Sequence, residues 1–319
     1  MRLPSSLISS KYIVITTICI VLVIAVYSYI FNIDILVTLF NLDLKWLSLS
    51  ILLALVGFLL ECIRLRYMVK LVGGEIGLVD VVKARAIGTL IAYITPSSMG
   101  GEPARAYIIN LHSSIGFWKA FGVTLIEAYV DAITVCFIAL LLSIRYIPLS
   151  IFITLTCAYT IVAVNLLLFM ALKVKSFSKF IEKFRERYFK SIEDKFNTKL
   201  NLTDVIEGIR SLFKRRFSII IAITFLRHFA SIFSIYFVGL AVMDNSSLIR
   251  CTEAYFFSSS VGIIPTPGAS GALEYGLSIT LPPSQVIVIR LINYTLTILL
   301  GLLSVILVLK QLKNHSSPH

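Results

Sequence analysis

Two short segments of the sequence combine prolines, glycines and charged residues inside apolar surroundings. The first, AYITPSSMGGEPARAY, runs from Ala92 to Tyr107, and the second, GIIPTPGASGALEYGL, runs from Gly262 to Leu277. Proline lacks a backbone donor and ends a helix, whereas glycine permits a tight reversal of the chain. Backbone N–H groups that are freed at the following helix N-terminus attract anions, phosphate in particular. The two segments therefore predict loops that are able to bind an anion.

One arginine and two glutamates decide how such loops would act. Arg105 lies within about one turn of the first loop, and a guanidinium can hold a phosphate through two hydrogen bonds. Glu102 and Glu274 can instead accept the freed N–H groups as helix caps. Anion binding and a purely structural hairpin are the two interpretations. The candidate residues of the loops are Thr95, Pro96, Gly100, Gly101, Glu102 and Arg105, then Thr266, Pro267, Gly268, Gly271 and Glu274.

Four further candidates are polar residues within long apolar segments. Glu127 and Asp131 are spaced i, i+4, which places both carboxylates on one face of a helix. Arg227 and His228 occur in the apolar segment FLRHFA. Because charges are costly in the centre of a bilayer, these side chains are expected to face the interior of a helical bundle. They predict either ion pairs that fix helix packing or a path for a polar substrate or protons.

The composition indicates what kind of protein positions these residues. The chain has 319 residues, of which 58% are hydrophobic and 14% charged, and its mean hydropathy is +0.92. These values are typical of a polytopic helical membrane protein. The net charge of +12 is concentrated beside apolar segments, which favours anionic lipid headgroups over nucleic acid as its partner. The five scattered cysteines are expected to pack as apolar residues rather than bind metal or form disulfides.

Six apolar segments approach the length that crosses a bilayer, about 20 residues. They are Tyr12–Phe31, Trp46–Cys62, Phe117–Ser143, Leu149–Leu172, Phe217–Met243 and Gln285–Leu309. Two shorter segments, Ala84–Thr95 and Thr252–Ile264, end at the two loops and are expected to return to the face that they enter. The sequence thus predicts an all-α membrane protein with six full transmembrane helices and two broken re-entrant hairpins, up to eight membrane segments.

The distribution of Lys and Arg predicts the orientation. With both termini in the cytoplasm, 24 of the 29 Lys and Arg residues lie inside, and four lie outside, namely Lys45, Arg145, Arg250 and Arg290. If the first hairpin crossed the membrane, the Lys173–Arg216 segment, which carries 13 of them, would lie outside. Glu61 is expected to form an interfacial ion pair with Arg64 and Arg66. The inner charges before the first hairpin are Arg64, Arg66, Lys70, Lys83 and Arg85.

The two loops also indicate an internal repeat. Thr95-Pro96-x-x-x-Gly100 aligns with Thr266-Pro267-x-x-x-Gly271 at an offset of 171 residues. Each half would hold helix, helix, hairpin and helix, and three full crossings in each half make the second half inverted. Paired interrupted helices in inverted halves are typical of transporters. The expected single membrane domain, 1–319, consists of a first half at 1–146 and a second at 147–172 and 217–310.

The basic segment at 173–216 joins these halves and carries two amphipathic stripes. The first lies within Phe177–Tyr188, and the second consists of Leu202, Val205, Ile206, Ile209, Leu212 and Phe213. Basic amphipathic helices lie on a membrane surface and contact anionic lipid. We expect that role on the inner surface, with a cytoplasmic docking site as the alternative.

The two loop motifs resemble those of a known family. ITPSSMGGEPARAY and IPTPGASGALEYG look like the T-P-x-x-x-G-G-E and P-T-P-G-x-x-G-x-x-E blocks of the lysylphosphatidylglycerol synthase membrane region, a flippase-like family. The resemblance covers nearly the whole chain, although PSSMG replaces the more usual glycine-rich form. It implies movement of a lipid between leaflets. Two-part members also carry a cytosolic synthase domain, for which the residues after Leu309 leave no room.

Together these features predict a plasma-membrane translocator that binds an anionic headgroup between the hairpins, without a metal or cofactor. The headgroup would belong to a phospholipid or a polyprenyl phosphate, and the resemblance implies a separate glycosyltransferase or lipid synthase as partner. The alternatives are a transferase that uses Glu127 and Asp131 as acid and base, and an ion-coupled transporter of small anions. The sequence contains no Walker A, H-E-x-x-H or G-x-S-x-G motif, so ATP bound to this chain is not expected to drive transport.

Overall fold

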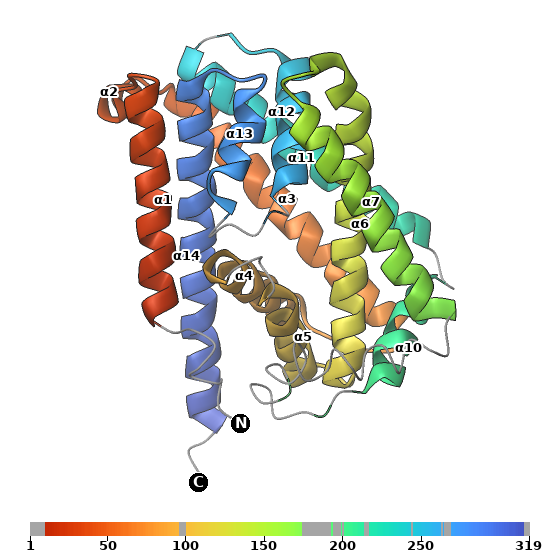
Figure 1. The fold of residues 1–319 in the computed structure, drawn as a ribbon. Helices are drawn as coiled ribbons and strands as arrows, with labels where there is room; N and C mark the ends of the chain where they lie inside the picture. The colour runs from red at the N-terminus through yellow and green to blue at the C-terminus, as the bar shows by residue number, and fades with distance from the viewer. Residues whose placement is uncertain are drawn as a thin grey trace.

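The computed structural model describes residues 10–95, 100–173, 193, 199, 201–213, 217–243, 245–262, 264 and 269–315. The regular secondary structure of these residues is helical throughout. The predictions made for Pro96, Thr266, Pro267 and Gly268, and for the first amphipathic stripe, lie outside the described residues. Figure 1 shows the long helices side by side, with shorter helices between them.

Four helices are long and apolar enough to cross a membrane. They are α3 (Leu44–Leu71), α6 (Phe117–Ser143), α11 (Phe217–Met243) and α14 (Pro283–His315). Each presents large exposed apolar side chains, as expected of surface that faces lipid. These helices correspond to four of the six predicted spans, and α3 continues beyond the predicted end of its span, where Arg64 is buried.

The other two predicted spans are also helices. They are α1 (Ser10–Ile30), which leads into the short α2 (Ile35–Phe40), and α7 (Ile151–Lys173). Their apolar parts within the residues whose burial is described, Thr17–Ile30 and Ile151–Leu166, are shorter than a full span. The protein is therefore a polytopic all-α membrane protein, and the number of its crossings stays a prediction.

Two hairpins of short helices lie against the long ones. One consists of α4 (Leu78–Ile94) and α5 (Gly101–His112), and the other of α12 (Leu248–Val261) and α13 (Ala272–Ser278). In Figure 1, α4 and α5 lie in the lower half of the molecule and α12 and α13 in the upper half. The order long, short, short, long thus occurs twice along the chain, in α3–α6 and in α11–α14.

The first hairpin turns where the sequence predicts it. Thr95 precedes a proline, a position that disfavours helical backbone, and its ψ of 140° ends α4. Its hydroxyl donates to the Ile91 carbonyl at 2.8 Å and accepts from the Gly100 N–H at 3.1 Å, which joins the two ends of the loop. In the second hairpin, Gly271 has φ 84°, a left-handed conformation that favours glycine, immediately before α13.

Glycines bring the arms of both hairpins into close contact. A Cβ on Gly88 of α4 would lie 2.3 Å from Cγ of Arg105, so this glycine leaves the space that the arginine side chain crosses. A Cβ on Gly276 of α13 would lie 2.6 Å from the backbone nitrogen of Ser258 on α12. In the first hairpin a glycine thus admits a side chain of the other arm, and in the second a glycine admits the backbone of the other arm. Small residues allow such close packing of helices in membranes.

The helix α10 (Leu202–Phe213) follows the second amphipathic stripe, but its apolar face packs against the bundle. Val205, Ile209 and Leu212 are buried, and a Cβ on Gly122 of α6 would lie 2.4 Å from the Val205 carbonyl oxygen. The expected lipid contact of this stripe is therefore wrong for these three residues, because α6 covers them. Side chains of α3–α6 and α10 form most of one apolar core. Side chains of α7, α11–α14 and the end of α6 form a second.

Candidate functional site

The carboxylate of Glu127 on α6 lies where three helices bring arginines together. Its Oε1 accepts from Arg64 of α3 at 3.1 Å, and its Oε2 accepts from Arg85 of α4 at 3.1 Å and from Arg105 of α5 at 2.5 Å. The Glu127 side chain has no exposed surface. Because a buried carboxylate is costly without such partners, this one side chain holds α3, α4 and α5 against α6.

Asp131 lies one turn further along α6 on the same face. Arg64 donates to its two carboxylate oxygens at 2.6 Å and 2.7 Å, the fork geometry that suits a guanidinium, and also to the Thr224 hydroxyl of α11 at 2.8 Å. The prediction that Glu127 and Asp131 share one inward face is confirmed. Asp131 keeps 22% of its side-chain surface exposed, so it is more accessible than Glu127.

Glu61 of α3 connects this cluster to α11. Its Oε2 accepts from Arg85 Nε at 2.8 Å, and its Oε1 lies 2.8 Å from Arg227 Nε. Arg227 Nη1 lies 3.7 Å from Asp131 Oδ1. Glu61, Glu102, Glu127 and Asp131 thus balance four arginines in one ion-pair network. Arg227 is the member of this network that α11 contributes.

The predicted interfacial pair of Glu61 with Arg64 and Arg66 is wrong. Arg64 and Glu61 lie within one turn of α3, but each pairs with residues of other helices. Arg66 Nε donates instead to the Ile76 carbonyl at 3.2 Å. Sequence spacing identified neighbours on α3, whereas the charges are neutralised across the bundle.

Arg105 and Glu102 form an ion pair in the first turns of α5. Arg105 Nη2 donates to Glu102 Oε1 while Nη1 donates to Glu127, and Arg105 Nε is buried without a hydrogen-bond partner. The Gly100 N–H is taken by Thr95. Glu102 therefore acts as the partner of Arg105 rather than as the side-chain cap of Gly100. Gly101 packs close to the Gly88 carbonyl of α4.

In the second hairpin the capping interpretation applies. The Gly271 N–H donates to Glu274 Oε2 at 2.7 Å, and Glu274 Oε1 accepts from Arg290 Nε of α14 at 2.7 Å. The Arg290 guanidinium stacks on the ring of Tyr294 at 4.3 Å and also bonds its hydroxyl. A glycine N–H that the sequence offered to an anion is thus occupied by Glu274, which fixes Arg290.

His228 is a residue of α11 whose side chain packs against α12. Its Nδ1 lies 2.7 Å from the Tyr255 hydroxyl and 3.3 Å from Arg227 Nη1, and its Nε2 is buried without a hydrogen-bond partner. The rings of Tyr255 and Phe256 contact the imidazole. His228 thus sits behind Arg227, where it supports the orientation of that side chain.

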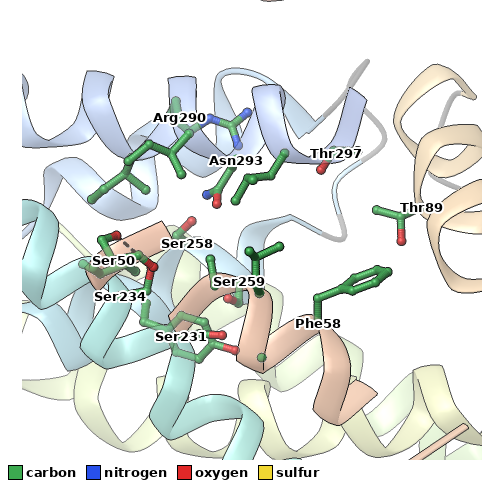
Figure 2. Close-up of a pocket in the computed structure, with 18 of the residues that line it drawn as sticks. Ser50, Phe58, Thr89, Ser231, Ser234, Ser258, Ser259, Arg290, Asn293 and Thr297 are labelled. Carbon is green, nitrogen blue, oxygen red and sulfur yellow. Dashed lines mark hydrogen bonds between the residues drawn. The ribbon is translucent and has the colours of Figure 1, made fainter. Parts of the chain in front are cut away.

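A cavity of about 380 Å³, lined by both polar and apolar side chains, lies between the two hairpins. Helices α3, α4, α11, α12, α13 and α14 line it, and its charged lining residues are three arginines and one glutamate. Serine, threonine and asparagine side chains surround it, as Figure 2 shows. These charged residues are Arg85, Arg227, Arg290 and Glu61. We call this space the central cavity.

A second cavity, of about 370 Å³, lies beside the loops of both hairpins. Glu102 and Arg105 line it from the first hairpin, and Gly262 and Ala269 from the second. It shares five lining residues with the central cavity, which places the two spaces against each other. The shared residues are Arg85, Tyr93, Arg227, Ser259 and Leu273. We call this space the loop cavity.

Long apolar helices around a buried ion-pair network, with charged residues lining two cavities, define a polytopic membrane protein with charges in its interior. A family model described as the lysylphosphatidylglycerol synthase TM region matches residues 12–301. The chain belongs to this family, and the resemblance inferred from its two loop motifs is confirmed.

Two relatives are similar along most of their length. A UPF0104 membrane protein of Methanothermobacter thermautotrophicus is 22% identical over 288 residues, which cover 82% of this chain and 85% of the relative. A UPF0104 membrane protein of Methanocaldococcus jannaschii is 23% identical over 323 residues, which cover 91% and 93%. No solved structure matches the chain.

Four charged residues of the site were not among the sequence candidates. Glu61, Arg64 and Arg85 were assigned to the membrane surface, and Arg290 was counted as an outer charge, yet all four are buried or nearly so. Each lies within one or two turns of an apolar segment's end, where charges normally indicate an interface. The sequence did contain a signal for Arg85. Arg85 lies near the middle of α4, which has only 17 residues, so the loop that follows α4 is never far from it.

Proposed function

We propose that the protein moves a lipid with an anionic headgroup between leaflets, and that the headgroup binds in the central cavity between the hairpins. The observation that carries this proposal is the charge of that cavity, which three arginines and one glutamate line. A volume of about 380 Å³ falls within the range of small-molecule sites and suits a headgroup with its phosphate.

Arg227 retains a donor for such an anion. Arg227 uses Nε for Glu61 and Nη1 for Asp131 and His228, and its Nη2 makes no hydrogen bond or ion pair with a described residue. Arg227 keeps 20% of its side chain exposed and lines both cavities. A guanidinium that carboxylates hold through two of its nitrogens, with the third unpaired, is ordered in advance for a phosphate.

The arrangement of the hairpins supports movement of the headgroup through the protein rather than binding alone. The two cavities meet at Arg85, Tyr93 and Arg227, so a headgroup moving from one to the other passes guanidinium groups throughout. The repeated element order and the opposite positions of the hairpins support an inverted repeat. In that arrangement each hairpin closes the cavity toward one side of the membrane in turn.

A translocation assay tests the proposal. The purified protein is reconstituted into phosphatidylcholine vesicles that contain acyl-labelled phosphatidylglycerol, acyl-labelled phosphatidic acid or a polyprenyl phosphate labelled on its isoprenoid chain. We expect at least one of these anionic lipids to reach the inner leaflet faster than in protein-free vesicles. Arg227→Gln should slow this movement, whereas Arg250→Gln, a change at an exposed position outside both cavities, should not. Rates equal to those of protein-free vesicles for all three lipids would contradict the proposal.

A further inference from the structure

We infer that the headgroup carries several hydroxyl groups beside its phosphate, as in a glycerol, inositol or sugar phosphate, and not an amine. This inference rests on the proposed function and names the chemical class of its substrate. The observation is the juxtaposition, on one wall of the central cavity, of Arg290 with the unpaired side chains of Asn293 and Thr297.

The central cavity is lined by many groups that bind hydroxyls. Figure 2 shows these side chains arranged around the cavity on facing helices. Some of them already have partners, since Ser50 Oγ lies 3.0 Å from Ser234 Oγ and Thr89 donates to the backbone carbonyl of Arg85 at 2.9 Å. The hydroxyl and amide residues are Ser50, Thr89, Tyr93, Ser231, Ser234, Tyr255, Ser258, Ser259, Asn293 and Thr297.

Other lining groups have unused hydrogen-bonding capacity. The side chains of Ser259, Asn293 and Thr297 make no hydrogen bond with any described residue, and Asn293 is exposed toward the cavity. Within a membrane bundle, such donors and acceptors need water or a ligand as partner. An amide and a hydroxyl each donate and accept, which is the property that a hydroxylated ligand matches.

The spacing along α14 fits one extended ligand. Arg290, Asn293 and Thr297 follow the i, i+3, i+7 pattern, so they lie on the same face of the helix, as Figure 2 shows. Seven residues of α-helix span about 10 Å. That distance accommodates a phosphate at Arg290 and a glycerol or sugar substituent beside Asn293 and Thr297.

The carboxylates of both cavities leave no unpaired partner for an ammonium group. Glu61, the carboxylate of the central cavity, is bridged to Arg85 and Arg227. In the loop cavity, Asp131 is paired with Arg64 and Glu102 with Arg105. A headgroup amine would have to displace a guanidinium and would meet three arginines in the central cavity, so like charges disfavour it.

The test compares lipids that share one labelled acyl chain and differ only in the headgroup. Reconstituted vesicles receive phosphatidylglycerol, phosphatidylinositol, phosphatidic acid or phosphatidylethanolamine, and the translocation rate of each is measured. We expect one of the two hydroxylated lipids to move about fivefold faster than phosphatidic acid and phosphatidylethanolamine, because unmade hydrogen bonds reduce the binding of the latter. Equal rates for phosphatidic acid or phosphatidylethanolamine would overturn this inference and leave the proposed function standing.

Two variants assign the preference to α14. Asn293→Leu and Thr297→Val should lower the ratio of the preferred-lipid rate to the phosphatidic acid rate toward one. Thr295→Val is the matched control, because Thr295 is exposed on α14 outside the cavity. A preference that survives both cavity substitutions would overturn the inference.

A further arm separates a lipid from a soluble ester of the same chemistry. Vesicles are incubated with radiolabelled glycerol phosphate, and its uptake is measured beside lipid movement. Lipid movement without uptake supports the inference. Uptake of glycerol phosphate without movement of any lipid would overturn both the inference and the proposed function.

Discussion

At the scale of single residues, Glu127 is the acceptor on which the network depends. It receives hydrogen bonds from three arginines and has no exposed surface. Glu127→Gln removes the charge that offsets these guanidinium groups, so we expect the free energy of unfolding to fall by about 3–5 kcal/mol. Glu207→Gln, at an exposed ion pair with Lys119, should cost less than about 1 kcal/mol. Chemical unfolding in detergent micelles measures both, and equal losses would contradict this role.

Variants of the Arg290–Glu274 pair distinguish a structural role of Arg290 from a role in binding the headgroup. Arg290→Gln leaves Glu274 buried without its cation and should destabilise the protein by about 3–5 kcal/mol. Replacing both residues by Gln removes both charges and should restore most of that loss. We expect the double variant to fold and still translocate anionic lipids more slowly, because the central cavity has lost an arginine. A stable double variant with the wild-type rate would remove Arg290 from the binding site.

Residue patterns predicted part of the site and missed another part for a physical reason. The i, i+4 spacing of Glu127 and Asp131 within an apolar helix was sufficient to predict their shared inward face. The partners of these carboxylates come from α3, α4 and α5, and no sequence spacing relates residues across packed helices. Arg64 and Arg85 were therefore read as surface charges, since a basic residue near the end of an apolar segment usually marks the interface.

At the scale of elements, the hairpins depend on close contact between their arms. A Cβ on Gly276 would lie 2.6 Å from the Ser258 backbone nitrogen, which cannot move without shifting α12. Gly276→Ala should therefore lower the free energy of unfolding by about 1–3 kcal/mol. Gly116→Ala is the control, because no atom lies within 4 Å of its Cβ position. If both variants unfold alike in a thermal shift assay in detergent, α12 and α13 do not pack as described.

The positions of both hairpins followed from proline and glycine, because these residues restrict the backbone locally. Thr95 ends α4 and Gly271 precedes α13, as the loop motifs indicate. The environment of α10 did not follow in the same way. Its stripe predicted a helix with one buried face, but periodicity does not say whether lipid or protein covers that face, and here α6 covers it.

At the scale of the whole molecule, buried arginines change how the orientation is derived. Arg64, Arg85 and Arg105 lie in the ion-pair network and Arg290 pairs with Glu274, so none of them marks a loop. Removing three from the 24 inner charges and one from the four outer charges leaves 21 and three. The bias is preserved, and α1 begins and α14 ends at the same, lower end of Figure 1.

Site-directed labelling tests this orientation. Glu75 and Ser247 are exposed residues in the connections that lead into the two hairpins. A single cysteine at Glu75 should react with a membrane-impermeant maleimide only after cells are opened, and one at Ser247 should react in intact cells. This result follows from opposite entry of the hairpins. Labelling of both positions from the same side would exclude an inverted repeat.

The central cavity is where the network, the hairpins and the proposed lipid path meet, so its occupancy is the decisive observation. An experimental structure of the protein in a lipid nanodisc with phosphatidylglycerol would locate the headgroup directly. We predict headgroup density in the central cavity, with its phosphate within hydrogen-bonding distance of Arg227 or Arg290. Headgroup density confined to the outer surface of α3, α6, α11 and α14, in a preparation that translocates this lipid, would contradict the proposed binding site.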